Sequence, residues 1–180
     1  MRLRRNRGFT LQELLVAVAI GLVLLLVAVR AVGGALESAR SQDTRARLLA
    51  SMTLASSRAA LTGRHAVVCP SIDGRNCAPS VDWSGGWIVF LDADEDGESD
   101  AGERRLDHAE ALAGRVRLRS STGRRSVTFQ GNGGNAGSNL TFTLCDGRGP
   151  AQARSLVLAN SGRLRDAPAS AEAAAATCPS

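Results

Sequence analysis

The 180-residue chain has no lysine and no tyrosine, and its aromatic residues are limited to two tryptophans and four phenylalanines. Every basic side chain is therefore an arginine, whose planar guanidinium group suits bidentate contacts to phosphate. So few rings exclude an interleaved aromatic surface that would stack single-stranded bases. Any core must also depend on nearly all of them, and we expect five rings to carry much of it: Trp83, Trp87, Phe90, Phe129 and Phe142.

Signals of catalysis are missing too. The two histidines, His65 and His108, have no companion pattern for metal binding, and the sequence has no G-x-S-x-G or comparable nucleophile motif. Serine, histidine and aspartate all occur, but nothing in the sequence brings them together. We therefore expect a protein that is not an enzyme and that requires no cofactor.

Charge is absent from residues 14–29, an apolar stretch near the N-terminus. Counted from Phe9 the stretch is about 21 residues long, enough at ~1.5 Å per residue to cross a ~30 Å hydrocarbon layer. It leads into a polar helix without a small-residue cleavage site, so we expect a retained single-pass anchor. Four arginines before it hold the N-terminus in the cytoplasm and send the rest of the chain outward: Arg2, Arg4, Arg5 and Arg7.

One acid, Glu13, lies just before the uncharged stretch, inside the apolar segment that starts at Phe9. Because a carboxylate without a partner in lipid costs a few kcal/mol, an acid in this place is a functional candidate. The alternative is a plain anchor in which Glu13 lies near the interface.

The residues Arg-Gly-Phe-Thr-Leu-Gln-Glu at positions 7–13 resemble the leader of type IV pilins and pseudopilins. In those families a prepilin peptidase cuts after the glycine, which corresponds to Gly8, and Phe9 becomes a methylated N-terminus. The resemblance implies that Glu13 pairs with the Phe9 amine of a neighbouring subunit that joins a filament. Many pilins have proline at the place of Arg30, so we expect no kink there.

Charges of opposite sign are separated along the chain. Nine of the 17 acids fall within residues 92–110, whereas residues 111–165 contain nine arginines and one acid, Asp146. Without the four leader arginines, 18 of the 22 basic residues remain against the 17 acids, so the mature chain is almost neutral. The C-terminal half is nevertheless expected to present a positive field.

Four cysteines follow the anchor: Cys69, Cys77, Cys145 and Cys178. An even number in an oxidising compartment predicts two disulfides, for which three pairings are possible. We favour Cys69–Cys77, which closes a short Pro/Gly/Asn loop, together with Cys145–Cys178, which holds the C-terminal tail. A zinc site is the rival interpretation, and the absence of a C-x-x-C pair argues against it.

Beyond the anchor the periodicity predicts an α+β arrangement. Short β-rich runs suggest an antiparallel sheet whose inner face is covered by an amphipathic helix half. The helix is expected from Thr10 to about Thr62 with Gly63 as its C-cap, and its buried face comprises Leu48, Met52, Ala55 and Ala59. The β-rich runs are residues 66–69, 87–91, 116–118, 127–129, 140–144 and 156–158.

Residues 67–70 (VVCP), 83–92 (from Trp83 to Asp92) and 160–165 (NSGRLR) are similar to the GspH/FimT family of minor type IV pilins and type II secretion pseudopilins. The resemblance covers essentially the whole chain. It implies a pilin-like fold, in which a long N-terminal helix packs on an antiparallel β-rich head. We accordingly divide the chain into a leader (1–8), a transmembrane assembly helix (9–32), an amphipathic helix half (33–63), a periplasmic head (64–166) and an Ala-rich tail (167–180).

Residues 92–103 match the EF-hand loop spacing D-x-D-x-D-G with a glutamate in twelfth place. The flanking helices are missing, so this would be a loop-only calcium site. The alternative is a solvated acidic turn between strands, which the turn propensity of Asp and Gly also favours. The oxygen donors would be Asp92, Asp94, Asp96, Asp100 and Glu103.

Arginines recur at alternate positions, and a groove of them would bind nucleic acid by charge, without sequence preference. In the FimT branch of the family, a C-terminal G-R-x-R motif is associated with DNA capture, and the residues from Gly162 to Arg165 match it. The alternative is a solvated basic face or a filament contact with an acidic neighbour. The candidate DNA-binding residues are Gly162, Arg163, Arg165, Arg154, Arg115, Arg117 and Arg119.

These features together predict a minor pilin or pseudopilin of the bacterial inner membrane, with a cytoplasmic N-terminus and a periplasmic head. Its partners would be prepilin peptidase and other pilins, bound through the N-terminal helix, and it would be filament-associated after assembly. As a structural subunit it would initiate or cap a type II secretion pseudopilus or a type IV pilus. The alternative is a minor pilin that binds DNA for natural transformation.

Overall fold

A computed structural model of the protein describes residues 10–137 and 139–178. The chain divides into two compact units, one ending at Leu36 and the other, called the head below, beginning at Glu37. A single helix of 52 residues, α1 (Leu11–Thr62), forms the described part of the first unit and continues into the head. It has no break at Arg30, as expected from the absence of proline there.

Within the head, α1 is amphipathic. The predicted buried residues Leu48, Met52, Ala55 and Ala59 are at most 1% exposed, and their spacing places them on one face of the helix. The N–H of Gly63 donates to the carbonyl of Ala59 at 2.9 Å, and the φ of +69° at this residue suits glycine. The predicted buried face and the predicted end of the helix are therefore confirmed.

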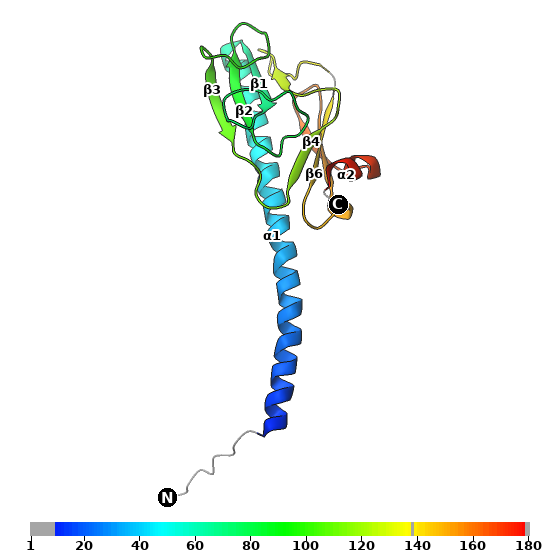
Figure 1. Cartoon of the computed structure of the whole chain (residues 1–180). Coiled ribbons are helices and arrows are strands. Elements are labelled where there is room, and N and C mark those ends of the chain that lie inside the picture. Colours follow the sequence, from blue (N-terminus) through cyan, green and yellow to red (C-terminus); the bar gives the residue numbers. More distant parts are fainter. Residues whose placement is uncertain (1–9, 138, 179–180) are drawn as a thin grey trace, which may run out of the picture. The chain divides into compact units, whose positions relative to one another are not determined.

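The rest of the head is built mainly from two four-stranded antiparallel sheets (Figure 1). Their strand orders are β3-β2-β1-β5 and β4-β6-β7-β8. A short 3-10 helix, η1 (Pro150–Gln152), precedes β7, and α2 (Ala171–Thr177) follows β8. The strands are β1 (His65–Pro70), β2 (Trp87–Asp92), β3 (Arg104–Ala109), β4 (Arg117–Ser120), β5 (Val127–Phe129), β6 (Leu140–Cys145), β7 (Arg154–Leu158) and β8 (Leu164–Pro168).

The structure has two strands that the β-rich runs did not predict, and two sheets in place of one. The six predicted runs overlap β1, β2 and β4 to β7. The additional strands, β3 (RRLDHA) and β8 (LRDAP), are too polar to show a β-rich pattern. Each lies at the edge of its sheet and pairs with one neighbour, where charged side chains are tolerated and discourage further pairing.

The described part of the expected Ala-rich tail at 167–180 contains the end of β8 and the helix α2. Ser170 caps α2, because its hydroxyl oxygen accepts the N–H of Ala173 at 3.2 Å. Ala174 is 4% exposed and packs with Cys145 and Ala153. Tertiary packing of this small apolar face gives the helix a support that composition does not reveal.

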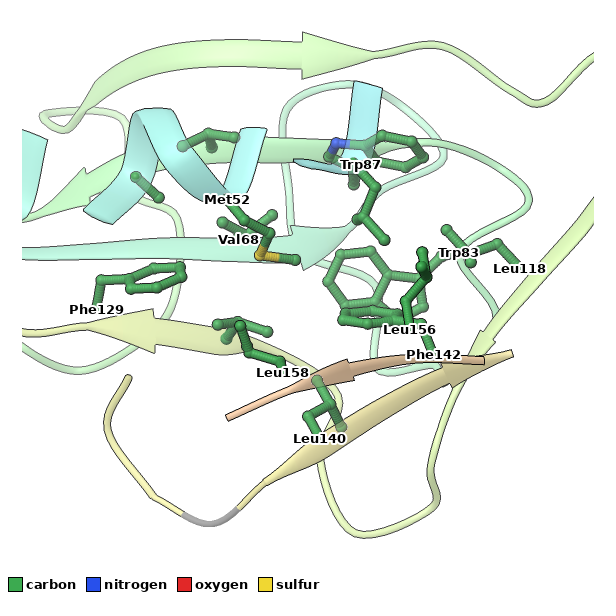
Figure 2. Packing of buried hydrophobic residues seen from close by; sticks show 14 of the residues in the cluster. Met52, Val68, Trp83, Trp87, Leu118, Phe129, Leu140, Phe142, Leu156 and Leu158 are labelled. Carbon is green, nitrogen blue, oxygen red and sulfur yellow. The ribbon is translucent and has the colours of Figure 1, made fainter. Parts of the chain in front are cut away.

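One core joins α1 to the inner faces of both sheets (Figure 2). The helix contributes Met52, the first sheet Val68 and Phe129, and the second sheet Leu140 and Phe142. The indole N–H of Trp87 donates to the hydroxyl of Ser51 at 3.0 Å, so the buried ring keeps a polar partner on the helix. All five rings expected in the core are at most 1% exposed. Trp83, Trp87, Phe129 and Phe142 lie in this core, whereas Phe90 lies in a separate buried cluster.

Each sheet is also buried on part of its outer face, beside a disulfide. Both predicted disulfides are present, Cys69–Cys77 and Cys145–Cys178. The first ties the loop after β1 to a small cluster that includes Ile88 and Phe90. The second ties the segment after α2 to β6. Two short segments therefore cover surface that a chain with few aromatics would otherwise expose.

Candidate functional site

The N-terminal end of α1 contains a reciprocal cap. The backbone N–H and the hydroxyl of Thr10 donate to Oε2 of Glu13 at 2.9 and 3.0 Å, and the N–H of Glu13 donates back to the Thr10 hydroxyl at 3.3 Å. This is a capping box, which satisfies donors that the first helical turn leaves free. The predicted cleavage residues, Gly8 and Phe9, lie outside the described residues.

The part of α1 that belongs to the first unit is apolar on all sides. An 18-residue window of the helix has a mean hydropathy of 2.8, and none of it is buried. The side chains of Leu11, Leu26 and Val32, for example, are 76%, 68% and 67% exposed. By length and composition this helix can cross a membrane, and so much exposed apolar surface needs either lipid or other helices around it.

A buried ionic network lies where the head begins. Oε1 of Glu37 accepts a hydrogen bond from Arg40 at 3.0 Å, and Oε2 accepts the N–H of Gly147 at 2.9 Å. The carboxylate of Asp146, 1% exposed, accepts two bonds from the guanidinium of Arg148, at 2.9 and 2.7 Å. These bonds connect α1 to the corner after β6, and each buried charge keeps a partner.

Asp146 and Arg148, the two charged residues of this corner, shift each other's pKa. Burial raises the pKa of Asp146, but the hydrogen bonds and the charge of Arg148, with a further bond from Ser41, hold that pKa below its usual value. The same hydrogen bonds raise the pKa of Arg148. Sequence reasoning missed Glu37, although its place on the buried face of the helix, 11 residues before Leu48, is a signal that could have found it.

The acidic loop after β2 is folded around its own backbone. Asp92 is 1% exposed and accepts the N–H groups of Glu95 and Gly97 at 2.8 and 3.1 Å. Glu103 accepts those of Ala93 and Asp100 at 2.7 and 3.3 Å. Asp92 and Glu103, which were expected at the two ends of a calcium-binding loop, therefore both accept hydrogen bonds from the backbone of that loop.

The calcium site itself stays a prediction. Carboxylate oxygens of Asp92, Asp94 and Asp96 lie within 4.8 Å of one another, so these three predicted ligands are together. Asp94 and Asp96 are exposed, however, and exposed acids gather in turns without an ion. If an ion binds, it would hold the exposed side chains of Asp94 and Asp96 in place.

The arginines predicted to form one basic patch are divided between the two edges of the second sheet. Strands β4 and β8 are its edges, three strand spacings or roughly 14 Å apart. The three arginines in or just before β4 donate hydrogen bonds to backbone carbonyls: Arg115 to Gly147, Arg117 to Val116 and Arg119 to Ala176, at 3.1, 3.0 and 2.9 Å.

The β7–β8 hairpin carries the other three predicted arginines, of which Arg163 and Arg165 lie near its turn and are both exposed. Gly162 turns the hairpin with a φ of +78°, and a Cβ there would meet the carbonyl of Gly133 at 3.2 Å. Arg154 begins β7 and so lies at the opposite end of that strand. The structure groups Arg163 with Arg165 and places the remaining candidates elsewhere.

The two histidines do not share a site. His65 pairs in register with Asp92 at one end of β2, and His108 pairs with Ile88 near the other end. His65 Nε2 lies 3.9 Å from Oε1 of Glu95, on the acidic loop. Neither histidine has the other as a partner for metal or proton transfer.

Comparison with known families agrees with this architecture. The family described as type II transport protein GspH matches residues 44–162, more than half of the chain. The chain belongs to the GspH family. The prokaryotic N-terminal methylation motif matches residues 3–29, which contain the start of the apolar helix. The protein is therefore a member of the minor pilin and pseudopilin group, whose members are structural subunits.

Solved structures of similar fold include the type IV minor pilin FimU of Pseudomonas aeruginosa. It is 20% identical with a TM-score of 0.55, and the match covers 71% of this chain and 92% of that one. A second crystal form of FimU gives 21% and 0.56, with coverage of 73% and 88%. The minor pseudopilin EpsH of the Vibrio cholerae Type 2 Secretion System is 14% identical, with a TM-score of 0.49 and coverage of 72% and 97%. No curated protein sequence matches the chain significantly.

FimU confirms the predicted fold class. At 20–21% identity the likeness concerns the fold alone, which combines a long N-terminal helix with an antiparallel β-rich head. The GspH family and the methylation motif confirm the predicted family independently, because they are recognised in the sequence.

We expect the stability of the head to depend on ionised Asp146. Its pKa is lower in the folded chain than in the unfolded one, so it stabilises the fold above about pH 3.9, and this contribution is lost as the pH falls further. Asp146→Asn should lower the free energy of unfolding by about 3 kcal/mol at pH 7 and by much less at pH 2. Urea unfolding followed by tryptophan fluorescence measures both. Asp43→Asn, which breaks the exposed pair with Arg47, is the control and should cost under about 1 kcal/mol. An equal loss at both pH values for Asp146→Asn would contradict the assignment.

If the acidic loop binds calcium, the ion should raise the melting temperature of the head above its value in chelator. The double variant Asp94→Asn/Asp96→Asn should abolish this difference. Glu95→Gln/Glu98→Gln removes the same charge from the same loop at positions outside the predicted ligand set, and it should keep the difference. Identical melting curves of the wild type in calcium and in chelator would dismiss the site.

Proposed function

We propose that this member of the GspH family is a structural subunit of a filament machine in the bacterial inner membrane, either a type II secretion pseudopilus or a type IV pilus. The supporting observation is the apolar part of α1, whose side chains are exposed on every side and which overlaps the methylation motif at residues 3–29. Such a helix needs lipid before assembly and sister helices afterwards. The N-terminus would remain cytoplasmic, the head would be periplasmic, and no catalytic role is assigned to it.

Assembly would start with cleavage after Gly8 by prepilin peptidase, which makes Phe9 the methylated N-terminus. Glu13 then receives the Phe9 amine of a neighbouring subunit. The capping box supports this step, because both hydrogen bonds from Thr10 go to Oε2 of Glu13. Among the described residues Oε1 accepts no hydrogen bond, so one carboxylate oxygen remains for an incoming ammonium group.

Two variants separate the charge of Glu13 from its capping role. Glu13→Gln can keep the cap, since a glutamine carbonyl also accepts at this position, but it removes the charge. We expect it to reduce incorporation into filaments by at least tenfold, measured as the fraction of the chain that sediments with sheared filaments. Thr10→Ala removes the hydroxyl from the cap and keeps the charge, so it should incorporate nearly as well as the wild type. Normal assembly of Glu13→Gln, or a native N-terminus other than Phe9, would argue against the proposal.

A second candidate function is DNA binding at the β7–β8 hairpin. Arg163 and Arg165 are exposed, and no described acidic side chain forms a salt bridge with either. Guanidinium groups in this state can neutralise phosphates. The hairpin alone supports this function, since Arg115, Arg117 and Arg119 donate to backbone carbonyls at the other edge of the sheet.

DNA binding of this kind predicts a salt-dependent affinity of the full chain in detergent for short duplexes. Arg163→Ala/Arg165→Ala should reduce the slope of log affinity against log salt by roughly two, because two phosphate contacts are lost. Arg104→Ala/Arg125→Ala removes the same charge elsewhere on the head and should leave that slope unchanged. No binding at low salt would exclude this function.

A further inference from the structure

The head contains an arginine-lined cleft near its first residue. The cleft has a volume of about 290 Å³ and lies between α1 and the second sheet. Leu144 and Leu156 contribute its apolar part. Its charged lining comes from Arg45, Arg148, Arg154 and one acid, Asp166, with Ser38 and Gln42 among the neutral polar side chains.

Charge in this cleft favours an anion. Arg45 is paired with Asp166, and both side chains are about half exposed. Arg148 is paired with Asp146, but only the arginine is accessible, with 30% of its side chain exposed against 1% for the acid. Arg154 is exposed and has no acidic partner among the described residues. The accessible surface therefore carries more positive than negative charge.

The chemistry of the donors indicates a phosphate. Guanidinium groups present N–H donors in a plane, which matches two oxygens of one phosphate. Ser38 and Gln42 add neutral donors beside them.

The position of the cleft in the chain indicates where that phosphate would come from. Counted from Leu14, about 20 residues of α1 cross a hydrocarbon layer and end near Gly33. Ser38 follows five residues later, or about 8 Å along a helix and at most roughly 18 Å along an extended chain. The headgroup layer is about 5–8 Å thick on each side of the hydrocarbon, and an arginine side chain can reach several ångström toward it.

We propose that this cleft binds the phosphate of an anionic phospholipid in the leaflet from which α1 emerges. The proposal rests on the membrane anchoring proposed above. Bound lipid would hold the beginning of the head at the membrane surface before a subunit is taken into a filament. Arg165 pairs in register with Val157, three residues or roughly 10 Å along β7 from Arg154, and Arg163 lies farther along the hairpin. Neither of these two arginines lines the cleft.

Lipid discs that hold the full chain provide the test. Trp83 and Trp87 are the only tryptophans and are fully buried in the head, so their fluorescence reports unfolding of the head. Replacing one third of the phosphatidylcholine with phosphatidylglycerol should raise the melting temperature by roughly 3–6 °C, as expected when a ligand is present at ten times its Kd. Arg45→Gln/Arg154→Gln should abolish this rise.

The control is Arg163→Gln/Arg165→Gln, which removes the same charge and should keep the rise in full. The melting temperature of each variant in pure phosphatidylcholine shows whether it still folds, and recovery of the chain in the disc fraction tests membrane anchoring separately. An equal rise in both double variants, or none in the wild type, would overturn the proposal. A rise in pure phosphatidylcholine produced by added glycerol phosphate would assign the cleft to a soluble phosphate, and one produced by duplex DNA would assign it to nucleic acid; either would overturn the lipid assignment.

Discussion

The head depends on one helix face that serves two sheets. Leu48, Met52, Ala55 and Ala59 contribute to the same core as the inner faces of both sheets. Two of these four side chains are alanines, and small residues allow a strand layer to approach a helix closely. Since the sheets share a single core around this face, neither would have a complete hydrophobic interior without α1. The helix that anchors the chain is therefore also the central element of the fold.

A chain with six aromatic residues has little material for a second core, and its outer sheet faces show how the shortage is met. Cys69–Cys77 and Cys145–Cys178 hold short polar or alanine-rich segments beside β1 and β6. Disulfides reduce the entropy of the unfolded chain, so modest apolar covers suffice there. At the entry of α1 into the head, the buried carboxylates of Glu37 and Asp146 replace apolar packing with paired charges.

The fold also redistributes charge that the chain carries in blocks. The acidic residues 92–103 begin at the end of β2, which pairs with the start of β1. Because β1 begins just after the C-terminal end of α1, the acidic loop lies at that end of the first sheet. The arginine-rich residues do not form one opposing surface. Some lie on β4, some on the β7–β8 hairpin, and Arg148 and Arg154 lie beside the first residues of the head. The positive field expected from the C-terminal half is thus divided into separate sites, each with its own neighbours.

The sequence by itself determined α1, its buried face, the five buried rings and the two disulfides, because each depends on local periodicity or on a small number of residues of one kind. It also determined the family, since the leader motif is a short continuous segment. Only the tertiary structure decided the existence of β3, β8 and α2, which need a neighbouring strand or a disulfide to be stable. It likewise decided which arginines lie together. The distance between residues on different strands depends on strand order, and local sequence does not encode that order.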